Sequence, residues 1–319
     1  MRRKQNTVYF EREGEKPKYV PVETLSEIYI FGEVTINKKL LEYMSQKEII
    51  LHFFNHHGYY VGSFYPREHY NSGMMILKQA EHYLDEDKRL DLARRFVRGA
   101  MRNMLKVLSY YNNRGIKLND LIDYINGKIP LIRDTGDINE LMALEGNVRE
   151  VYYNGFDRII SNPDFGFGSR TRRPPRNRLN ALISFGNSLC YVLVLSQIYR
   201  THLDPRIGYL HATNFRRFTL NLDVAEVFKP VLVDRIIFAL LNRKIIKKSH
   251  FREEMGGIYL GDKGRQIFLK EWENRLRTTI KHRGLKRNVS YRHLVRLELY
   301  KIERHLLGDG EYHPFIARW

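Results

Sequence analysis

The stretch PREHYNSGMMIL at residues 66–77 separates two kinds of sequence and decides the fold. Before it, short runs rich in aromatic and β-branched residues alternate with turn-forming residues, which is the pattern of β-strands. After it, apolar residues recur mostly every three or four positions, which is the pattern of amphipathic helices. Asn71-Ser72-Gly73 in the middle combines a turn with a helix start. The sequence therefore predicts an α+β protein with a strand-rich domain over residues 1–72 and a larger, almost all-helical domain over residues 73–319.

The predicted elements follow this division. The strands expected in the first domain are Thr7–Phe10, Tyr19–Val22, Ile28–Phe31, Ile49–Phe54 and Tyr59–Phe64, interrupted by one short helix, Lys38–Gln46. The helices expected in the second domain are Met74–Tyr83, Arg89–Asn112, Lys117–Asn126, Asp137–Asn162, Leu179–Arg200, Val224–Asn242, Asp262–His282 and Ser290–Leu307. Beyond residue 90, only Lys247–Leu260 has room for a small hairpin.

The charge balance indicates the class of partner. The 319 residues include 54 Lys and Arg against 36 Asp and Glu, which gives a formal net charge of +18 and a pI near 9.8. A basic excess of this size is typical of proteins that bind nucleic acid. Surface ion-pair networks of a heat-stable enzyme are the alternative, but they need both signs in similar number. Nucleic acid is therefore the expected partner.

Other classes are disfavoured. The single cysteine, Cys190, excludes an intramolecular disulfide framework and a cysteine-rich zinc site. The first six residues lack the apolar segment of a secretory signal. The most apolar run, Leu189–Leu195, is far shorter than the roughly 18 residues that a membrane helix needs. We therefore expect a cytoplasmic protein without a membrane segment.

Glu145 is the first candidate for chemistry. It falls in the apolar stripe of the predicted helix Asp137–Asn162, and a carboxylate on a packing face has to be paired, protonated or bound to metal. Gly146 beside it leaves room for a ligand. A salt bridge to Arg149 at i,i+4 is the alternative, and for Glu145 taken alone the sequence favours it.

A second acidic group follows further along the chain. Asp223 and Glu226 stand three residues apart at a predicted helix start and so share one face, and His211 precedes them by twelve residues. Capping of the helix is the alternative role for Asp223. One imidazole with two or three carboxylates is a ligand set suited to Mn²⁺ or Mg²⁺. Together with Glu145, these residues predict a site for a divalent cation.

Two basic stretches are candidates for contact with DNA. The loop Arg170–Arg178 has five arginines in nine residues, and the segment Arg275–Arg304 has ten Lys and Arg against two Glu. A solvated basic face is the alternative for both. The residues predicted to bind DNA are Arg170, Arg172, Arg173, Arg176, Lys229, Lys286, Arg287 and Arg292.

Several blocks of the chain resemble a known family. They are LMALEG (141–146) with Tyr152-Tyr153, RPP (173–175) followed by NALISFG (180–186), DPRIGYLH (204–211), DVAEVFKP (223–230) and YHPF (312–315). In this order they are similar to the CRISPR-associated protein one family, the endonuclease and integrase of spacer acquisition. Because the blocks extend over nearly the whole chain, together they indicate the family more specifically than any one block does alone.

The resemblance carries further implications. It implies a homodimer formed through the β-domains, and a divalent-metal site made by Glu145, His211 and Asp223, with Glu226 at a neighbouring acidic position whose role varies. Asn177 stands where members often have aspartate, and Lys229 where arginine is common. The family also often has one more strand at its N-terminus than these residues predict, which leaves the completeness of the first sheet open.

The predicted function is that of a metal-dependent DNA endonuclease and integrase. In this reaction the 3′-hydroxyl of a captured DNA fragment attacks a phosphodiester of a CRISPR array, with Mg²⁺ or Mn²⁺ bound by the acidic cluster. The resemblance also implies assembly with CRISPR-associated protein two. The alternatives are a non-catalytic, architectural DNA-binding protein and, since the residues alone do not separate them, an RNA nuclease. A pure binder has no reason to gather acidic residues beside DNA.

Overall fold

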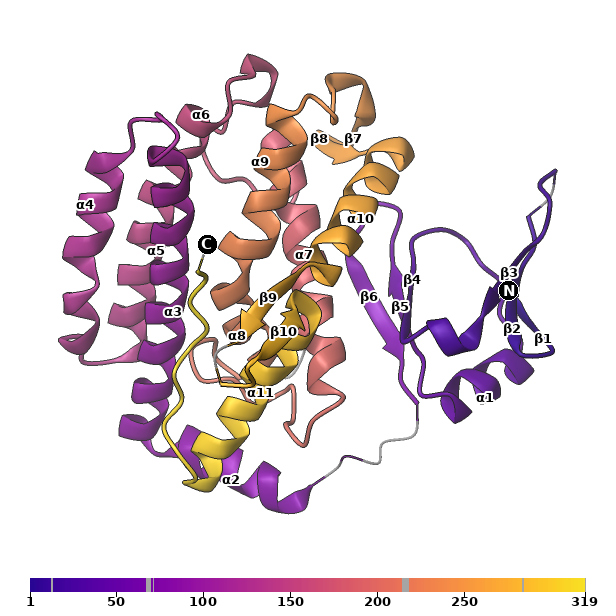
Figure 1. Cartoon of the computed structure of the whole chain (residues 1–319), viewed down its shortest axis with the longest axis horizontal. Coiled ribbons are helices and arrows are strands. Elements are labelled where there is room, and N and C mark those ends of the chain that lie inside the picture. Colours follow the sequence, from indigo (N-terminus) through magenta and orange to yellow (C-terminus); the bar gives the residue numbers. More distant parts are fainter. Residues whose placement is uncertain (13, 67–69, 71, 214–217, 283, 319) are drawn as a thin grey trace. The chain divides into compact units, whose positions relative to one another are not determined.

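The chain forms two compact units, residues 1–71 and residues 72–319, which are described separately. Figure 1 shows a computed structural model of the whole chain. It describes all residues except 13, 67–69, 71, 214–217, 283 and 319. The division falls one residue before the predicted boundary.

The first unit contains two three-stranded sheets. Antiparallel β1, β2 and β3 form one sheet, and β4, β5 and β6 form the other, in which β4 and β5 run parallel and β5 and β6 antiparallel. Helix α1 makes the crossover between the parallel strands, as parallel pairing requires. The bounds are β1 Arg2–Lys4, β2 Thr7–Phe10, β3 Lys18–Pro21, a 3₁₀ turn Val22–Thr24, β4 Glu27–Ile30, α1 Lys38–Gln46, β5 Ile50–Phe54 and β6 Tyr60–Phe64.

The core of the first unit lies between α1 and the strands. Leu40 and Met44, one turn apart on α1, are fully buried together with Val8 and Leu51 of the strands. Asn37 begins the helix, because its side chain accepts a hydrogen bond from the backbone N–H of Leu40. The helix bounds and all five predicted strands agree with the prediction to within a residue, whereas β1 was not predicted.

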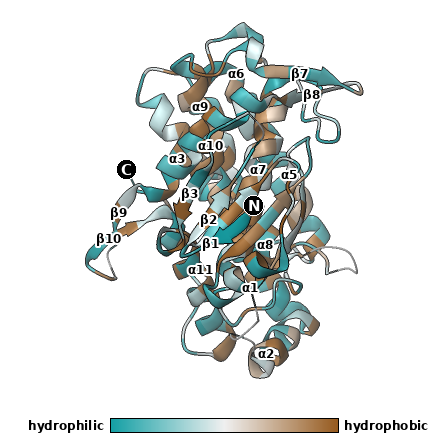
Figure 2. Cartoon of the chain, turned by 90° about the vertical axis from the view of Figure 1, so that its right-hand side faces the viewer, coloured by the Kyte–Doolittle hydropathy of each residue, from teal (hydrophilic) through white to brown (hydrophobic). Residues whose placement is uncertain are grey.

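The second unit is almost all helical, which confirms the predicted α+β class. In Figure 2 its helices have brown apolar and teal polar residues along the same element, as amphipathic helices do. The α-helices are α2 Gly73–Leu84, α3 Glu86–Asn112, α4 Asn119–Lys128, α5 Ile138–Asn154, α6 Phe156–Ile159, α7 Arg178–Ile198, α8 Leu220–Lys229, α9 Arg235–Asn242, α10 Asp262–Arg277 and α11 Tyr291–Leu307. Between them lie the 3₁₀ turns Pro130–Arg133, Pro163–Phe165 and Lys248–His250, the π turn Pro230–Asp234, and the hairpin strands β7 Phe251–Glu254, β8 Gly257–Leu260, β9 Thr279–His282 and β10 Arg287–Ser290.

Three of the predicted helices differ from the structure by four residues or more at one end. The helix predicted over Asp137–Asn162 ends at Asn154, and the short helix α6 follows it after Gly155. The helix predicted over Asp262–His282 ends at Arg277, because the β-branched residues that follow pair with Arg287–Ser290 as the antiparallel hairpin β9–β10. The helix predicted over Val224–Asn242 begins four residues earlier, and a π turn accommodates Pro230 within it. The hairpin β7–β8 lies within Lys247–Leu260, the segment in which the sequence left room for a small hairpin.

Helix α7 is more apolar than the sequence analysis recognised. By length and hydropathy Arg178–Ile198 would be long enough to cross a membrane, but 78% of its most apolar window is buried inside the protein. Its neighbours include α8 and α11. The apolar surface of α7 is therefore covered by protein, as in the core helix of a soluble domain.

Helix α8 is the central element of the second unit. It packs between α3 and α7, and all of its residues except Leu222 are buried. Asn103 on α3 links α8 to the C-terminal tail. The buried amide of Asn103 on α3 donates to the carbonyl of Val227 on α8 (2.7 Å) and to that of Phe315 (2.9 Å), and it accepts from the N–H of Ala317 (2.8 Å).

We therefore expect the loss of the Asn103 hydrogen bonds to lower the free energy of unfolding measurably. Asn103→Ala would remove the three hydrogen bonds that join α3 to α8 and to the C-terminal tail, so the free energy of unfolding should fall by roughly 3 kcal/mol. Urea denaturation measures this change. Asn139→Ala, at an exposed position of α5, is the control and should change the free energy of unfolding little. Equal stability of the two variants would contradict the proposed role of the Asn103 amide.

Candidate metal centre

The four residues predicted as metal ligands come from three segments of the second unit. Glu145 lies on α5, Asp223 and Glu226 lie one turn apart on α8, and His211 lies in the segment between α7 and α8. Asp223 does not cap α8, since the helix begins at Leu220 and Asp223 lies in its first turn. The capping alternative is therefore excluded.

Asp223 is a fully buried acceptor of four hydrogen bonds. Its Oδ2 accepts from the backbone N–H groups of Tyr209 (2.6 Å) and Leu210 (3.1 Å). Its Oδ1 accepts from the N–H of His211 (3.0 Å) and lies 2.7 Å from His211 Nδ1. A carboxylate has about four lone-pair positions, so all of them are used. Asp223 thus holds the loop to α8, and by accepting from Nδ1–H it leaves Nε2 of the imidazole available as a metal ligand.

The close approach of this loop requires glycine at position 208. A β-carbon on Gly208 would lie 2.7 Å from the carbonyl carbon of Thr219 and 2.8 Å from Asp223 Oδ2. The backbone N–H of Gly208 donates to Thr219 Oγ1 at 2.9 Å. Any larger residue would push the loop, and with it His211, away from α8.

Arg149 joins Glu145 to Glu226. Its Nε lies 2.6 Å from Glu145 Oε1, and its Nη2 forms ion pairs with both Glu145 and Glu226. The salt bridge between Glu145 and Arg149, which the sequence left open as the alternative, is therefore present. Its second partner, Glu226, is 77 residues away in the sequence and was not predicted.

Glu226 is ionised although it is buried. Burial raises its pKa, but the positive charges of Arg149 and Lys229 outweigh burial, and the pKa is about 2. The proximity of His211 also lowers it. Burial lowers the pKa of Lys229, but the carboxylate of Glu226 outweighs this effect and raises it. The arrangement is a partly buried cluster of two carboxylates and two cations, with the imidazole close to one carboxylate.

This donor set fits a divalent cation. Within the described residues, Glu145 Oε2 has no hydrogen-bond partner, and the side chains of Glu145 and His211 are 16% and 22% exposed, so they face solvent in part. Oxygen ligands with a single imidazole suit Mg²⁺ or Mn²⁺ better than a structural zinc. Asp223, whose lone pairs are all engaged, fits a role in orienting His211 better than direct ligation.

Asp234 is a buried carboxyl group that the sequence analysis missed. It lies at the end of the π turn after α8, and the hydroxyl of Tyr152 on α5 donates to its Oδ2 at 2.9 Å. Burial raises its pKa to about 7. An acidic residue within the apolar run Val231–Ile237 was the available signal.

The raised pKa of Asp234 predicts a pH-dependent stability. Between about pH 4 and pH 7 the folded protein binds the proton that the unfolded chain releases, so stability is lost as pH rises through this window. Asp234→Asn keeps an acceptor for Tyr152 and removes the ionisation. It should therefore be more stable than the unsubstituted protein at pH 8, by on the order of a few kcal/mol, and the gain should shrink towards pH 5. Urea unfolding at both pH values measures it, with the exposed Asp123→Asn as control. A gain that did not depend on pH would contradict this explanation.

The residues predicted to bind DNA occupy different environments. Arg172, Arg173 and Arg176 are exposed on the loop before α7, and Lys286 and Arg287 are exposed in the hairpin β9–β10. The Arg170 guanidinium instead bonds to Asn180 Oδ1 (2.9 Å) and Ser184 Oγ (3.0 Å). Arg292 is half-buried and pairs with Glu273 at 2.7 Å.

Lys229 differs from its prediction. Its side chain is buried, and Nζ bonds to Glu226 and to the hydroxyl of Tyr191 (2.6 Å). Because the ammonium group neutralises an internal carboxylate, the structure does not support Lys229 as a surface contact for a DNA phosphate. Its i,i+3 spacing from Glu226 was the sequence signal for this pairing.

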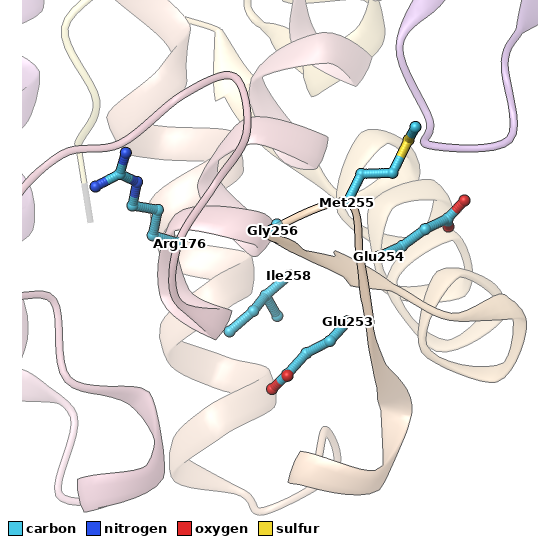
Figure 3. A pocket seen from close by; sticks show the side chains of 7 residues that line it. Arg176, Glu253, Glu254, Met255, Gly256 and Ile258 are labelled. Atoms are coloured by element: carbon cyan, nitrogen blue, oxygen red, sulfur yellow. The ribbon is translucent and has the colours of Figure 1, made fainter.

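The arginine loop rests on the hairpin β7–β8. The N–H of Ile258 donates to the carbonyl of Pro175 (2.7 Å), and beside this contact lies an open cavity of about 450 Å³. Figure 3 shows that the side chains of Arg176, Glu253 and Glu254, which line it, point in different directions. Convergent polar groups are the mark of a catalytic pocket, and this cavity lacks them.

Comparison with known proteins defines the class. The family model described as "CRISPR associated protein Cas1" matches residues 1–274. A CRISPR-associated endonuclease Cas1 from Thermodesulfovibrio yellowstonii is 60% identical over 100% of this chain and 96% of its own length. One from Thermotoga maritima is 50% identical over 97% of this chain and 94% of its own length.

Solved structures agree with this result. The structure of a Cas1 protein from Thermotoga maritima has a TM-score of 0.86 and 49% identity, and the match covers 97% of this chain and 94% of that one. A casposase bound to integration product has the same fold, with a TM-score of 0.86 at 16% identity, over 99% of this chain and 92% of that one. The fold is thus one that a Cas1 protein and a casposase share. The chain belongs to the Cas1 family, which confirms the resemblance recognised in its sequence.

Proposed function

We propose that this protein is a metal-dependent DNA endonuclease and integrase that inserts captured DNA fragments into a CRISPR array. The observation that carries the proposal is the partly buried cluster in which Arg149 joins Glu145 to Glu226, with His211 beside it. Relatives that are up to 60% identical are named CRISPR-associated endonucleases, which supports the nuclease activity. The choice of Mg²⁺ or Mn²⁺ rests on the donor set alone.

We propose Glu145, Glu226 and His211 Nε2 as the ligands of the cation. This set differs from the one that the resemblance implied, because Asp223 orients His211 and holds the loop. A divalent cation bound there would activate the attacking oxygen and neutralise charge that develops on the phosphate oxygens. Arg149 and Lys229 keep Glu226 ionised, and the hydrogen bond from His211 Nδ1 to Asp223 fixes the imidazole. Attack by a DNA 3′-hydroxyl would join strands, and attack by water would cut them.

The proposal extends to partners. A solved structure with the same fold is titled a Cas6-RT-Cas1–Cas2 complex, and we propose assembly with CRISPR-associated protein two, a homodimer formed through the strand-rich unit, and a cytoplasmic location. The basic excess supports duplex DNA as the substrate. An architectural DNA-binding protein without catalysis is the alternative.

The ligand assignment predicts the effect of three substitutions. Glu145→Gln, Glu226→Gln and His211→Ala should each lower Mn²⁺-dependent cutting and strand joining by about 100-fold or more, because removal of a ligand forfeits several kcal/mol of transition-state stabilisation. DNA affinity at fixed salt should stay unchanged. Cleavage and binding are measured on the same preparation of each variant.

Two further variants make this test specific. Glu150→Gln removes an exposed carboxylate from the same helix as Glu145 and should leave cleavage intact. Asp223→Asn should lower both cleavage and the free energy of unfolding, since its amide group would meet the N–H donors that the carboxylate accepts from. Full cleavage by the Glu145 or His211 variant would contradict the ligand assignment, and a lack of cleavage by the unsubstituted protein would favour the architectural DNA-binding protein instead.

The arginine loop predicts a salt effect. If Arg172, Arg173 and Arg176 bind phosphates, replacing them with alanine should flatten the log–log plot of duplex affinity against salt by ~0.9 for each phosphate that is no longer bound. Fluorescence anisotropy with a labelled duplex at several salt concentrations measures the slope. An unchanged slope for the triple variant would exclude binding of the DNA backbone by this loop in solution.

A further inference from the structure

A group of cations on and beside α3 concentrates positive charge. Arg98 and Arg102 lie one turn apart on this helix, Lys106 follows another turn later, and Arg133 ends the 3₁₀ turn Pro130–Arg133. Burial lowers the pKa of Arg98, and three neighbouring guanidinium groups lower it further. These groups belong to Arg133, Arg102 and Arg95. The 3₁₀ turn that Arg133 ends packs against α3, so these positive charges lie close together in space, although Arg133 is 35 residues from Arg98 in the sequence.

The surrounding acidic residues do not balance this charge. In the part of the chain that the structure describes, Arg98, Arg102, Lys106 and Arg133 form no ion pair within 4.0 Å. Arg95, at the edge of the group, is paired; its partners are Asp91 (2.7 Å) and Glu311 (3.3 Å). Between Asp91 and Asp120 the sequence contains seven Lys and Arg and no acidic residue. Cations held together without counter-charges favour the binding of an anion.

The arrangement suits an extended polyanion rather than a single small anion. Residues four apart on a helix are about 6 Å apart along its axis, so Arg98, Arg102 and Lys106 form a row of about 12 Å. Arg102, Lys106 and Arg133 are exposed and Arg98 is half-buried. Guanidinium groups bind phosphate oxygens in pairs of hydrogen bonds. A rigid row of this kind matches successive phosphates of a nucleic-acid backbone.

A different side of α3 faces the candidate metal centre. Asn103, next to Arg102 in sequence, is buried and donates to the Val227 carbonyl beside Glu226. Neighbouring positions on a helix point about 100° apart, so the row of cations and the contact with α8 lie on different faces. A DNA segment on the row would therefore contact α3 without entering the carboxylate cluster.

We propose that Arg98, Arg102, Lys106 and Arg133 form a binding surface for the phosphate backbone of duplex DNA, separate from the metal centre and from the arginine loop at residues 170–178. The inference rests on the proposed function, since it assumes a DNA substrate. The role of this surface is to bind a part of the DNA duplex that lies away from the reacting strand. Removal of this surface should weaken DNA binding and leave the chemical step unchanged.

The test compares two double variants of the full-length protein that remove the same charge. Arg98→Ala/Arg102→Ala removes two cations of the row, and Arg243→Ala/Lys270→Ala removes two exposed cations elsewhere in the second unit. Affinity for a labelled 30-base-pair duplex is measured from low to moderate salt. The row variant should flatten the log–log salt slope by ~1.8, which is the value for two phosphate contacts, and the control should barely change it.

Two more measurements make the outcome decisive. Arg98→Lys/Arg102→Lys keeps the charges and should restore the slope while recovering only part of the affinity, because lysine cannot bind phosphate in the bidentate manner. Cleavage at saturating DNA should have the same kcat in the row variant as in the unsubstituted protein. Equal slopes for the row and control variants would overturn the inference. If the unsubstituted protein neither bound nor cut DNA, the proposed function itself would fail.

Discussion

The burial of charge on α8 is the constraint on which the second unit depends. Asp223, Glu226 and Lys229 are all buried on this one helix, and a buried charge without compensation costs several kcal/mol. Compensation comes from outside the helix for two of them: the loop at residues 208–211 supplies donors to Asp223, and Arg149 of α5 reaches Glu226. The positions of α5, α8 and this loop are thus fixed by directional polar contacts as well as by apolar packing. The same contacts create the centre to which we assign the chemistry.

The predictable part of the molecule is the part that local pattern determines. Apolar residues recur every second position in strands and about every 3.6 positions in helices, and the two spacings can be told apart within about ten residues. The α+β class and most element bounds therefore followed from the sequence. Glu145 was found because a carboxylate in an apolar stripe is a local anomaly. The β9–β10 hairpin was missed because the helical pattern of α10 continues in the sequence beyond Arg277, and only the pairing with residues 287–290 ends it.

The unpredicted part depends on contacts between distant segments. Lys229 was predicted to bind DNA and stands where arginine is common in the family, but its burial follows from the packing of α8 between α3 and α7. The distinction between Asp223 and Glu226 was also inaccessible, because the sequence places both on one helix face and does not show which one accepts hydrogen bonds from the loop. Arg98 and Arg102 have the sequence pattern of an ordinary polar helix face, and only the packing of the 3₁₀ turn Pro130–Arg133 against α3 brings Arg133 near them.

Charge balance at the centre connects metal binding with DNA binding. Glu145 and Glu226 are already neutralised by Arg149 and Lys229, so in the free protein a divalent cation would add two positive charges to a cluster that is neutral as a whole. A phosphodiester beside it carries the negative charge that offsets this excess. In the proposed function, therefore, cation and DNA should each bind more tightly in the presence of the other, since a coupling free energy between two sites acts equally in both directions. The basic surfaces that concentrate DNA on the protein would then also favour the assembly of its catalytic centre.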